Sequence, residues 1–161
     1  MAYTMKVDLG EVLQQVYNVS RPVGPGLYAP YARDDVLLVQ TLIKLANFTR
    51  FHPGHGPVER SRSIKIDGIF GPQTQRLLKA FEQNQQRDGK LLISDGIVEP
   101  APRDGYTRSG VQYKIIHLNR EAKDAGWEYQ NLPFETTTHP LLRASLAKGA
   151  TKPTPVRPFP S

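Results

Sequence analysis

The sequence contains no cysteine, and this absence excludes several classes of chemistry. A chain without thiols has no disulfide framework, no cysteine nucleophile and no thiolate metal site. No apolar run approaches the roughly 18 residues of a membrane-spanning helix, so we expect no insertion into a membrane. The N-terminal segment MAYTMKVDLGEVLQQ lacks the basic-then-apolar layout of a secretory signal. We therefore expect a cytoplasmic protein, or one that reaches the periplasm or cell wall without a cleaved signal.

Familiar catalytic motifs are missing as well. The chain has no GxSxG, no HExxH and no glycine-rich phosphate loop followed by lysine. His52 and His55 have the HxxH spacing with Glu59 nearby, but zinc needs a further ligand, and we interpret this segment as a solvated loop. Paired carboxylates for glycoside cleavage stay open, because their separation in space decides the point; the local acidic residues are Glu82, Asp88, Asp95 and Glu99. We expect no catalytic activity, no metal and no cofactor.

The composition indicates one modest core with long connections. Of the 161 residues 39% are hydrophobic, whereas Pro 14 and Gly 13 are plentiful and cluster in connecting segments. The net charge is +6 and the isoelectric point is about 9.7. A basic surface attracts anionic polymers such as nucleic acid, acidic membranes or bacterial wall polymers, or it serves solubility alone. Net charge alone does not distinguish among these partners.

Apolar residues at helical spacing predict a mostly α protein. Helices are expected over 8–18, 33–48, 72–86, 106–125 and 139–148. Asp34 or Asp35 is expected to cap the second of these helices, and Pro72 to begin the third. The Gly- and Pro-rich segments between them are predicted to be a linker at 20–32, a long exposed loop at 49–63 and a basic Pro-rich tail at 149–161.

Two Asp-Gly turns repeat along the chain. The first lies in IDGIFGP, which ends at Pro72, and the second lies in SDGIVEP, which ends at Pro100. Glycine accepts the positive φ that such a turn requires. We expect Ile69 and Phe70 to point into the core and Pro72 to start the helix that follows.

The segment IDGIFGPQTQRLLKAFEQNQ follows a predicted helix and precedes a second DGIV and another helix. This order resembles the peptidoglycan-binding-like domain family, whose core pattern is xDGxFGPxT followed by AhxxFQ. The resemblance is tight over 66–83 and implies a small three-helix fold over 32–130. Residues 1–31 then form an N-terminal helix and linker, and 131–161 form a C-terminal helix and tail. The departures are a longer loop before Asp67, Val98-Glu99-Pro100 in place of Gly-Pro-x-Thr, and Phe81-Glu82 in place of Phe-Gln.

The two turns are expected to bracket a shallow groove, with the N-terminus of the 72–86 helix at its edge. Free backbone N–H groups and the positive end of the helix dipole there suit a carboxylate of a wall peptide. Most of the motif is also expected to build the fold, through the turns and the helix start. The predicted ligand-binding residues are Asp67, Gly71, Gln73, Thr74, Arg76, Lys79 and Asp95.

These features predict a non-catalytic module that binds bacterial peptidoglycan. The alternative is a structural or adaptor protein of a phage tail or secretion apparatus, in which the same fold makes protein–protein contacts. In that case the N-terminal helix or the Pro-rich tail docks on the partner. Nucleic acid is the weaker third alternative, because the basic and aromatic residues between 48 and 65 match no nucleic-acid motif.

Overall fold

The computed structural model describes residues 1–8, 13–25 and 32–148. In these residues five helices, which make the chain 42% helical, accompany two small antiparallel sheets. The protein is therefore mixed α/β. The prediction of a mostly α protein is confirmed in that helices are present, but it did not include the two sheets. The predicted tail and residues 26–31 of the predicted linker lie outside the described residues. The strands are β1 (Tyr3–Asp8), β2 (Leu13–Asn18), β3 (Thr49–His52) and β4 (Gly56–Arg60). The helices are α1 (Arg33–Ala46), α2 (Pro72–Arg87), α3 (Lys114–Ala122), α4 (Trp127–Gln130) and α5 (Pro140–Ala147), with 3₁₀ turns η1 (Ser61–Ser63) and η2 (Lys123–Ala125).

The N-terminal segment forms a β-hairpin, so the helix predicted over 8–18 is wrong where the structure describes it. β1 pairs antiparallel with β2 in a register that sets Tyr3 opposite Asn18. The hairpin buries Val7 and Val16 in the core, and the Asn18 side chain exchanges hydrogen bonds with the backbone of Ala101 at 2.8 and 3.1 Å. Apolar residues at helical spacing thus form a strand here, because long-range pairing and packing outweigh the local pattern.

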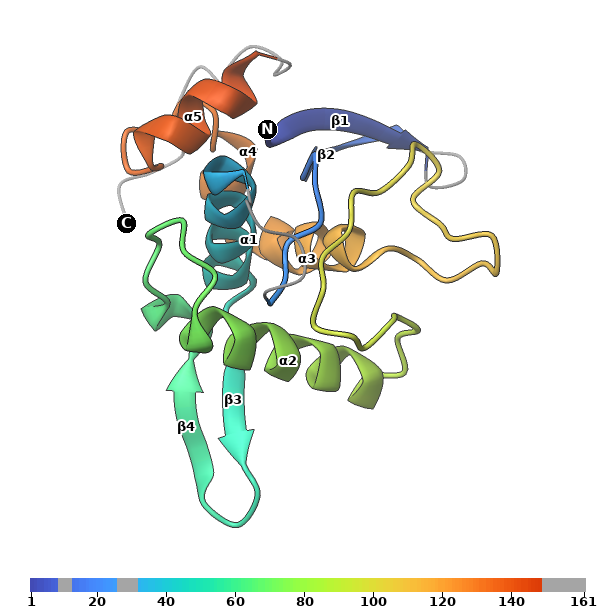
Figure 1. Ribbon diagram of the computed structural model, residues 1–161, viewed down its shortest axis with the longest axis vertical. Helices are drawn as coiled ribbons and strands as arrows, with labels where there is room; N and C mark the ends of the chain where they lie inside the picture. Colours follow the sequence, from blue (N-terminus) through green and yellow to red (C-terminus); the bar gives the residue numbers. More distant parts are fainter. Residues whose placement is uncertain (9–12, 26–31, 149–161) are drawn as a thin grey trace.

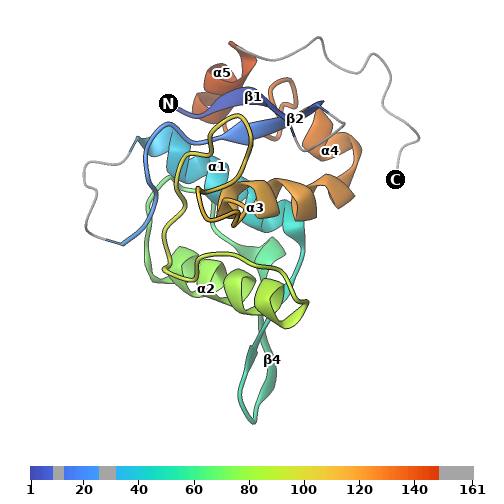
Figure 2. The same cartoon turned by 90° about the vertical axis from the view of Figure 1, so that its right-hand side faces the viewer.

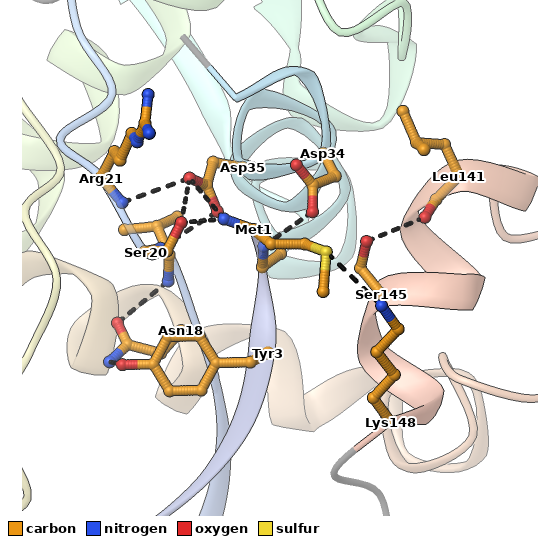
Figure 3. A network of polar contacts seen from close by, with 12 residues as sticks. Met1, Tyr3, Asn18, Ser20, Arg21, Asp34, Asp35, Leu141, Ser145 and Lys148 are labelled. Atoms are coloured by element: carbon orange, nitrogen blue, oxygen red, sulfur yellow. Dashed lines mark hydrogen bonds and ion pairs between the residues drawn. The ribbon is translucent and has the colours of Figure 1, made fainter.

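The first turn of α1 also differs from the prediction. Ala32 is the N-cap residue, and no side chain caps the helix. Asp34 Oδ2 instead accepts the N–H of Ala2 at 2.8 Å (Figure 3). Asp35 accepts the N–H and hydroxyl of Ser20 at 3.1 and 2.9 Å and the N–H of Arg21 at 3.2 Å. Burial raises the pKa of the Asp35 carboxyl, against the opposing effect of the Ser20 hydrogen bonds. The two carboxylates therefore attach the N-terminal segments to α1.

The segment 49–63, predicted to be an exposed loop, forms the hairpin β3–β4 followed by η1. It extends from the body at the end opposite to β1, β2 and α5 (Figures 1 and 2). Gly54, in its turn, and Gly56, the first residue of β4, have φ of +79° and +73°, which suits glycine. Most of its residues are exposed, as expected, but the short strands, interrupted by Pro57, gave no clear alternation in the sequence.

The limits of the remaining helices agree better with those predicted from the sequence. α2 begins at Pro72 as predicted, and α5 agrees with the helix predicted over 139–148. α3 is shorter than the predicted 106–125, because the segment before it turns back on itself through a bridge between Tyr106 and Gln112. Ile69 does not point inward: its side chain is 66% exposed, whereas Phe70 packs against the core.

One hydrophobic core joins the parts of the described chain. Its buried residues run from Ala2 to Leu146 and include Phe81 of α2. Val23 and Val98 form an antiparallel bridge with both N···O distances at 2.8 Å, which connects the segment before α1 to the second Asp-Gly turn. The N-terminal hairpin and α5 are therefore part of the same packed body as α1–α3. In the described ranges no helix is both long and apolar enough for a membrane span.

Candidate functional site

Gln40, in the middle of α1, holds the first Asp-Gly turn. Its buried Oε1 accepts the backbone N–H groups of Asp67 and Gly68 at 3.2 and 2.9 Å. Its Nε2 lies 3.1 Å from Asp67 Oδ1, 3.0 Å from Ile69 O and 3.0 Å from Thr74 Oγ1. Asp67 Oδ1 also accepts the N–H of Ile69 at 2.9 Å, and Gly68 has the expected positive φ of +74°. One amide side chain thus connects α1, the turn and the start of α2.

Glu82, on the buried face of α2, holds the second turn. Its Oε1 accepts the N–H of Gly96 at 2.9 Å, and Gly96 has φ of +72°. Asp95 Oδ1 accepts the N–H of Ile97 at 2.9 Å. Lys114, the first residue of α3, places Nζ 2.9 Å from Glu82 Oε1, 2.8 Å from Asp95 Oδ1 and 2.7 Å from Ile97 O. Glu82 and Lys114 are both buried, so this is an ion pair inside the protein.

The two turns share one arrangement with different chemistry. In each, a side chain from the preceding helix accepts the glycine N–H, and the aspartate accepts the N–H two residues later. The amide of Gln40 both accepts and donates, but the carboxylate of Glu82 only accepts. The second turn therefore needs a separate donor, and Lys114 supplies it. This gives a physical reason for a glutamate at position 82 together with a lysine at position 114.

Three of the predicted ligand-binding residues are engaged in these turns. Asp67 and Asp95 each accept the backbone N–H of their own turn, and buried Thr74 contacts Gln40. Partial burial opposes ionisation of Asp67, but hydrogen bonds from the Ile69 N–H and from Gln40 outweigh it and hold the pKa of this carboxyl below its usual value. These three side chains help to hold the turns: Thr74 is buried, Asp67 is partly buried and Asp95 is exposed.

The other predicted residues lie at the start of α2. Gly71 is the N-cap residue. Gln73 Oε1 accepts the N–H of Lys65 at 3.0 Å, and its Nε2 donates to Glu59 Oε2 at 3.2 Å. Arg76 Nε lies 3.4 Å from Glu59 Oε1 with 48% of its side chain exposed, and Lys79 is exposed. The structure thus brings six of the seven predicted residues to the first turn and the adjoining half of α2, and leaves Asp95 at the second turn.

Glu59 of β4 joins the hairpin to this region. Its carboxylate lies 3.1 Å from Arg50 Nε and contacts Gln73 and Arg76. Burial opposes its ionisation, but the hydrogen bonds from Gln73, Arg76 and Arg50 outweigh this and lower the pKa of the Glu59 carboxyl. Arg76 is therefore held in place rather than freely solvated.

Sequence reasoning missed the supporting residues. Gln40 and Lys114 were not singled out, and Glu82 was noted only as a candidate acid for catalysis and as a departure from the Phe-Gln pattern of the resemblance. The available signal was a polar residue on an otherwise apolar helix face: Val36 and Ile43, four residues before and three residues after Gln40, lie on the same side of α1, and all three are fully buried. Buried polar groups of this kind need partners, so such a position points to a specific hydrogen-bonding role.

His117 of α3 is a core histidine that connects to the second turn's loop. Its Nε2 lies 3.1 Å from Leu91 O, and Nδ1 lies 3.2 Å from Arg120 Nη1. A neutral ring that donates from Nε2 and accepts at Nδ1 satisfies both contacts. Burial, together with the charges of Arg120 and Lys90, lowers the pKa of His117 to about 4.

The lowered pKa of His117 predicts that the protein loses stability in mild acid. As the pH falls from about 6.5 to about 4, the unfolded chain takes up this proton before the folded one does, so the free energy of unfolding decreases through that window. The full shift corresponds to about 3 kcal/mol. Urea denaturation of the wild-type chain and of His117→Gln at pH 7, 5.5 and 4 measures it. We expect a flatter pH profile for His117→Gln, whereas His55→Gln on the exposed hairpin should follow the wild type; parallel profiles for all three would contradict the assignment.

His52 and His55 lie on the β3–β4 hairpin with ring centroids 4.9 Å apart. In the described part of the chain, no group of three or more His, Asp or Glu side chains is placed to hold a metal ion.

Comparison of the chain with known protein families, curated proteins and solved structures finds no match.

Proposed function

We propose that this protein is a non-catalytic module that binds bacterial peptidoglycan, with a three-helix core of the peptidoglycan-binding-like type formed by α1, α2 and α3. The observation that carries the proposal is the paired arrangement of the turns, in which α1 holds 67–68 and α2 holds 95–96 through the same hydrogen bonds. This arrangement coincides with the motif IDGIFGPQT, on which the resemblance depends.

The proposed ligand surface is the outer side of the first turn and of the N-terminal half of α2. Ile69 is largely exposed there, and so are Gln75, Arg76 and Lys79. The two cations add to the positive end of the helix dipole and suit the carboxylates of wall peptides. Ile69 offers apolar contact beside them. The buried bonds around Gln40 keep this surface fixed.

Co-sedimentation with purified peptidoglycan sacculi tests the proposal. We expect the wild-type chain to pellet at low and at physiological salt, and Arg76→Ala/Lys79→Ala to lose about tenfold or more in affinity, because two charge-assisted contacts are removed. Asp67 is left unchanged, since its removal would disturb the turn itself.

The matched control is Arg103→Ala/Arg108→Ala, which removes the same charge from exposed positions outside this surface. Circular dichroism and thermal unfolding verify that both variants fold. Equal pelleting of the two double variants would show that net positive charge, and not the proposed ligand surface, causes the binding. An absence of pelleting by the wild type at both salt concentrations would refute wall binding.

A second candidate function is the structural or adaptor protein, favoured by the hairpin β3–β4. This hairpin projects from the body (Figure 2) and carries Phe51 and Val58, which are 52% and 46% exposed. Large apolar side chains exposed on a projecting element are typical of a protein contact. The N-terminal helix that the sequence predicted as a docking element does not support this function, because that segment forms β1 and β2, which pack in the core.

A further inference from the structure

The positive charge of the chain is concentrated in the projecting hairpin and the turn that follows it (Figures 1 and 2). Residues 49–65, which include β3, β4 and η1, contain four Arg or Lys residues and one acidic residue, Glu59. They thus supply +3 of the net charge of +6 within 17 of the 161 residues. Glu59 is already held by two arginines, because its Oε1 lies 3.1 Å from Arg50 Nε and 3.4 Å from Arg76 Nε. The other cations of the segment therefore have no second acidic side chain within it to bind.

Three of these cations are available to a partner. Arg60, Arg62 and Lys65 are exposed, and none of them forms an ion pair with a described residue. Arg60 ends β4, Arg62 belongs to η1 and Lys65 lies two residues beyond η1, so the three cations are close together in the chain at the base of the hairpin. Closely spaced cations of this kind suit a polymer with regularly spaced anions, such as the phosphates of a nucleic acid.

The same hairpin exposes aromatic rings. The Phe51 side chain is 52% exposed, and the exposed rings of His52 and His55 have centroids 4.9 Å apart. The register sets Thr49 opposite Arg60, and side chains alternate along β3, so Phe51 and Arg60 lie on the same face of the hairpin. A face with an aromatic ring and a cation offers a base a surface for stacking and offers its phosphate a positive charge.

The acidic residues near Phe51 lie on the side of α2 and α3. Asp88, the C-cap residue of α2, and Glu121 of α3 line a cavity of about 360 Å³ together with Phe51. A separate cavity of about 390 Å³ lies along β4, and its lining includes Arg60 and the already paired Glu59. The side of the hairpin formed by β4 is therefore the side that accommodates phosphate groups.

We propose that the β3–β4 hairpin and η1 bind single-stranded nucleic acid. Phosphate groups contact Arg60, Arg62 and Lys65, and bases stack on Phe51 and on the two histidine rings. Single strands fit this surface better than a duplex, in which the faces of the bases are covered by their neighbours. Wall polymers and acidic membranes offer anions but no bases, so the exposed rings favour nucleic acid over them. This inference does not rest on the proposed wall binding, and it gives the hairpin a different partner from that of the adaptor function.

Fluorescence anisotropy of a labelled single-stranded oligothymidylate of about 12 nucleotides, titrated with the full chain, tests the proposal. We expect saturable binding that weakens with salt, with a slope of log affinity against log salt concentration of about −2 for three phosphate contacts. An abasic oligonucleotide of the same length keeps the phosphates and lacks the bases, and we expect it to bind about tenfold more weakly. Equal affinity for the abasic strand would overturn the proposal. So would an absence of saturable binding at low salt, which would leave the hairpin to the adaptor function.

Arg60→Ala/Arg62→Ala tests the phosphate contacts. We expect it to weaken binding and to reduce the size of the salt slope by about 1.4, because two phosphate contacts are lost. Arg103→Ala/Arg108→Ala removes the same charge from exposed positions outside the hairpin and should leave the slope unchanged. If both double variants reduce the slope equally, net charge and not the hairpin attracts the oligonucleotide, and the proposal is wrong.

Phe51→Leu tests the stacking of bases. Leucine keeps an apolar side chain but has no aromatic face, so we expect about tenfold weaker binding with an unchanged salt slope. Tyr106→Leu, at a position that is 42% exposed outside the hairpin, should bind as the wild type does. Circular dichroism and thermal unfolding verify that each variant folds. Full affinity of folded Phe51→Leu would refute stacking at this site, whereas failure of the wild type to pellet with sacculi would leave the inference standing.

Discussion

Replacing Gln40 with alanine should lower the free energy of unfolding by about 4 kcal/mol, which is a large part of the stability of a domain of this size. The substitution removes the acceptor for the N–H groups of Asp67 and Gly68 and the donor shared by Asp67 Oδ1, Ile69 O and Thr74 Oγ1. Each buried polar group left without a partner costs about 1–3 kcal/mol, and a small cavity adds to the loss. Urea denaturation measured by circular dichroism gives the change.

Two further variants separate the causes of that loss. Gln40→Glu keeps the size but replaces the donor with a carboxylate that faces Asp67 Oδ1 and Ile69 O, so we expect it to be strongly destabilising as well. Gln75→Ala, at an exposed position of α2, should change stability by less than about 0.5 kcal/mol. A Gln40→Glu chain as stable as the wild type would show that the cavity, and not the hydrogen bonding, accounts for the effect of alanine.

The sequence predicted the helical elements whose signals are local. α1 and α2 have apolar faces, and Pro72 marks the start of α2, so both helices were found within a few residues of their true limits. The Asp-Gly turns were recognisable for the same reason, since their positive φ depends on the glycine itself.

What the sequence did not predict depends on distant contacts. The strands β1 and β2 exist because they pair with each other and pack on the core, and the spacing of their apolar residues is compatible with a helix. Asp34 looked like a helix cap because nothing in the sequence indicates that Ala2 will lie beside it. The predicted site was likewise a list of motif residues, whereas the structure divides them into buried supports such as Thr74 and exposed residues such as Lys79.

The second turn should depend equally strongly on Lys114. Lys114→Met preserves most of the side-chain volume but leaves Glu82, which is 1% exposed, without its cationic partner. Removing one member of a buried ion pair typically costs about 3–5 kcal/mol, because the remaining charge stays in the protein interior. We therefore expect the free energy of unfolding to fall by about 4 kcal/mol in urea denaturation at pH 7, while Lys79→Met on the exposed face of α2 changes it by less than about 0.5 kcal/mol.

The double variant Glu82→Gln/Lys114→Met provides the decisive comparison. It removes both charges and leaves an amide that can still accept the N–H of Gly96, as Gln40 accepts that of Gly68 in the first turn. We expect it to be more stable than Lys114→Met alone by about 1–2 kcal/mol, because a neutral amide is buried at lower cost than an unpaired carboxylate. If the double variant is the less stable of the two, Lys114 does not compensate the buried negative charge of Glu82. The Glu82–Lys114 pair is then not the equivalent of Gln40 in the first turn. If the double variant recovers stability as expected, the glutamate after Phe81 and the lysine at the start of α3 form a coupled replacement for the glutamine of the first turn.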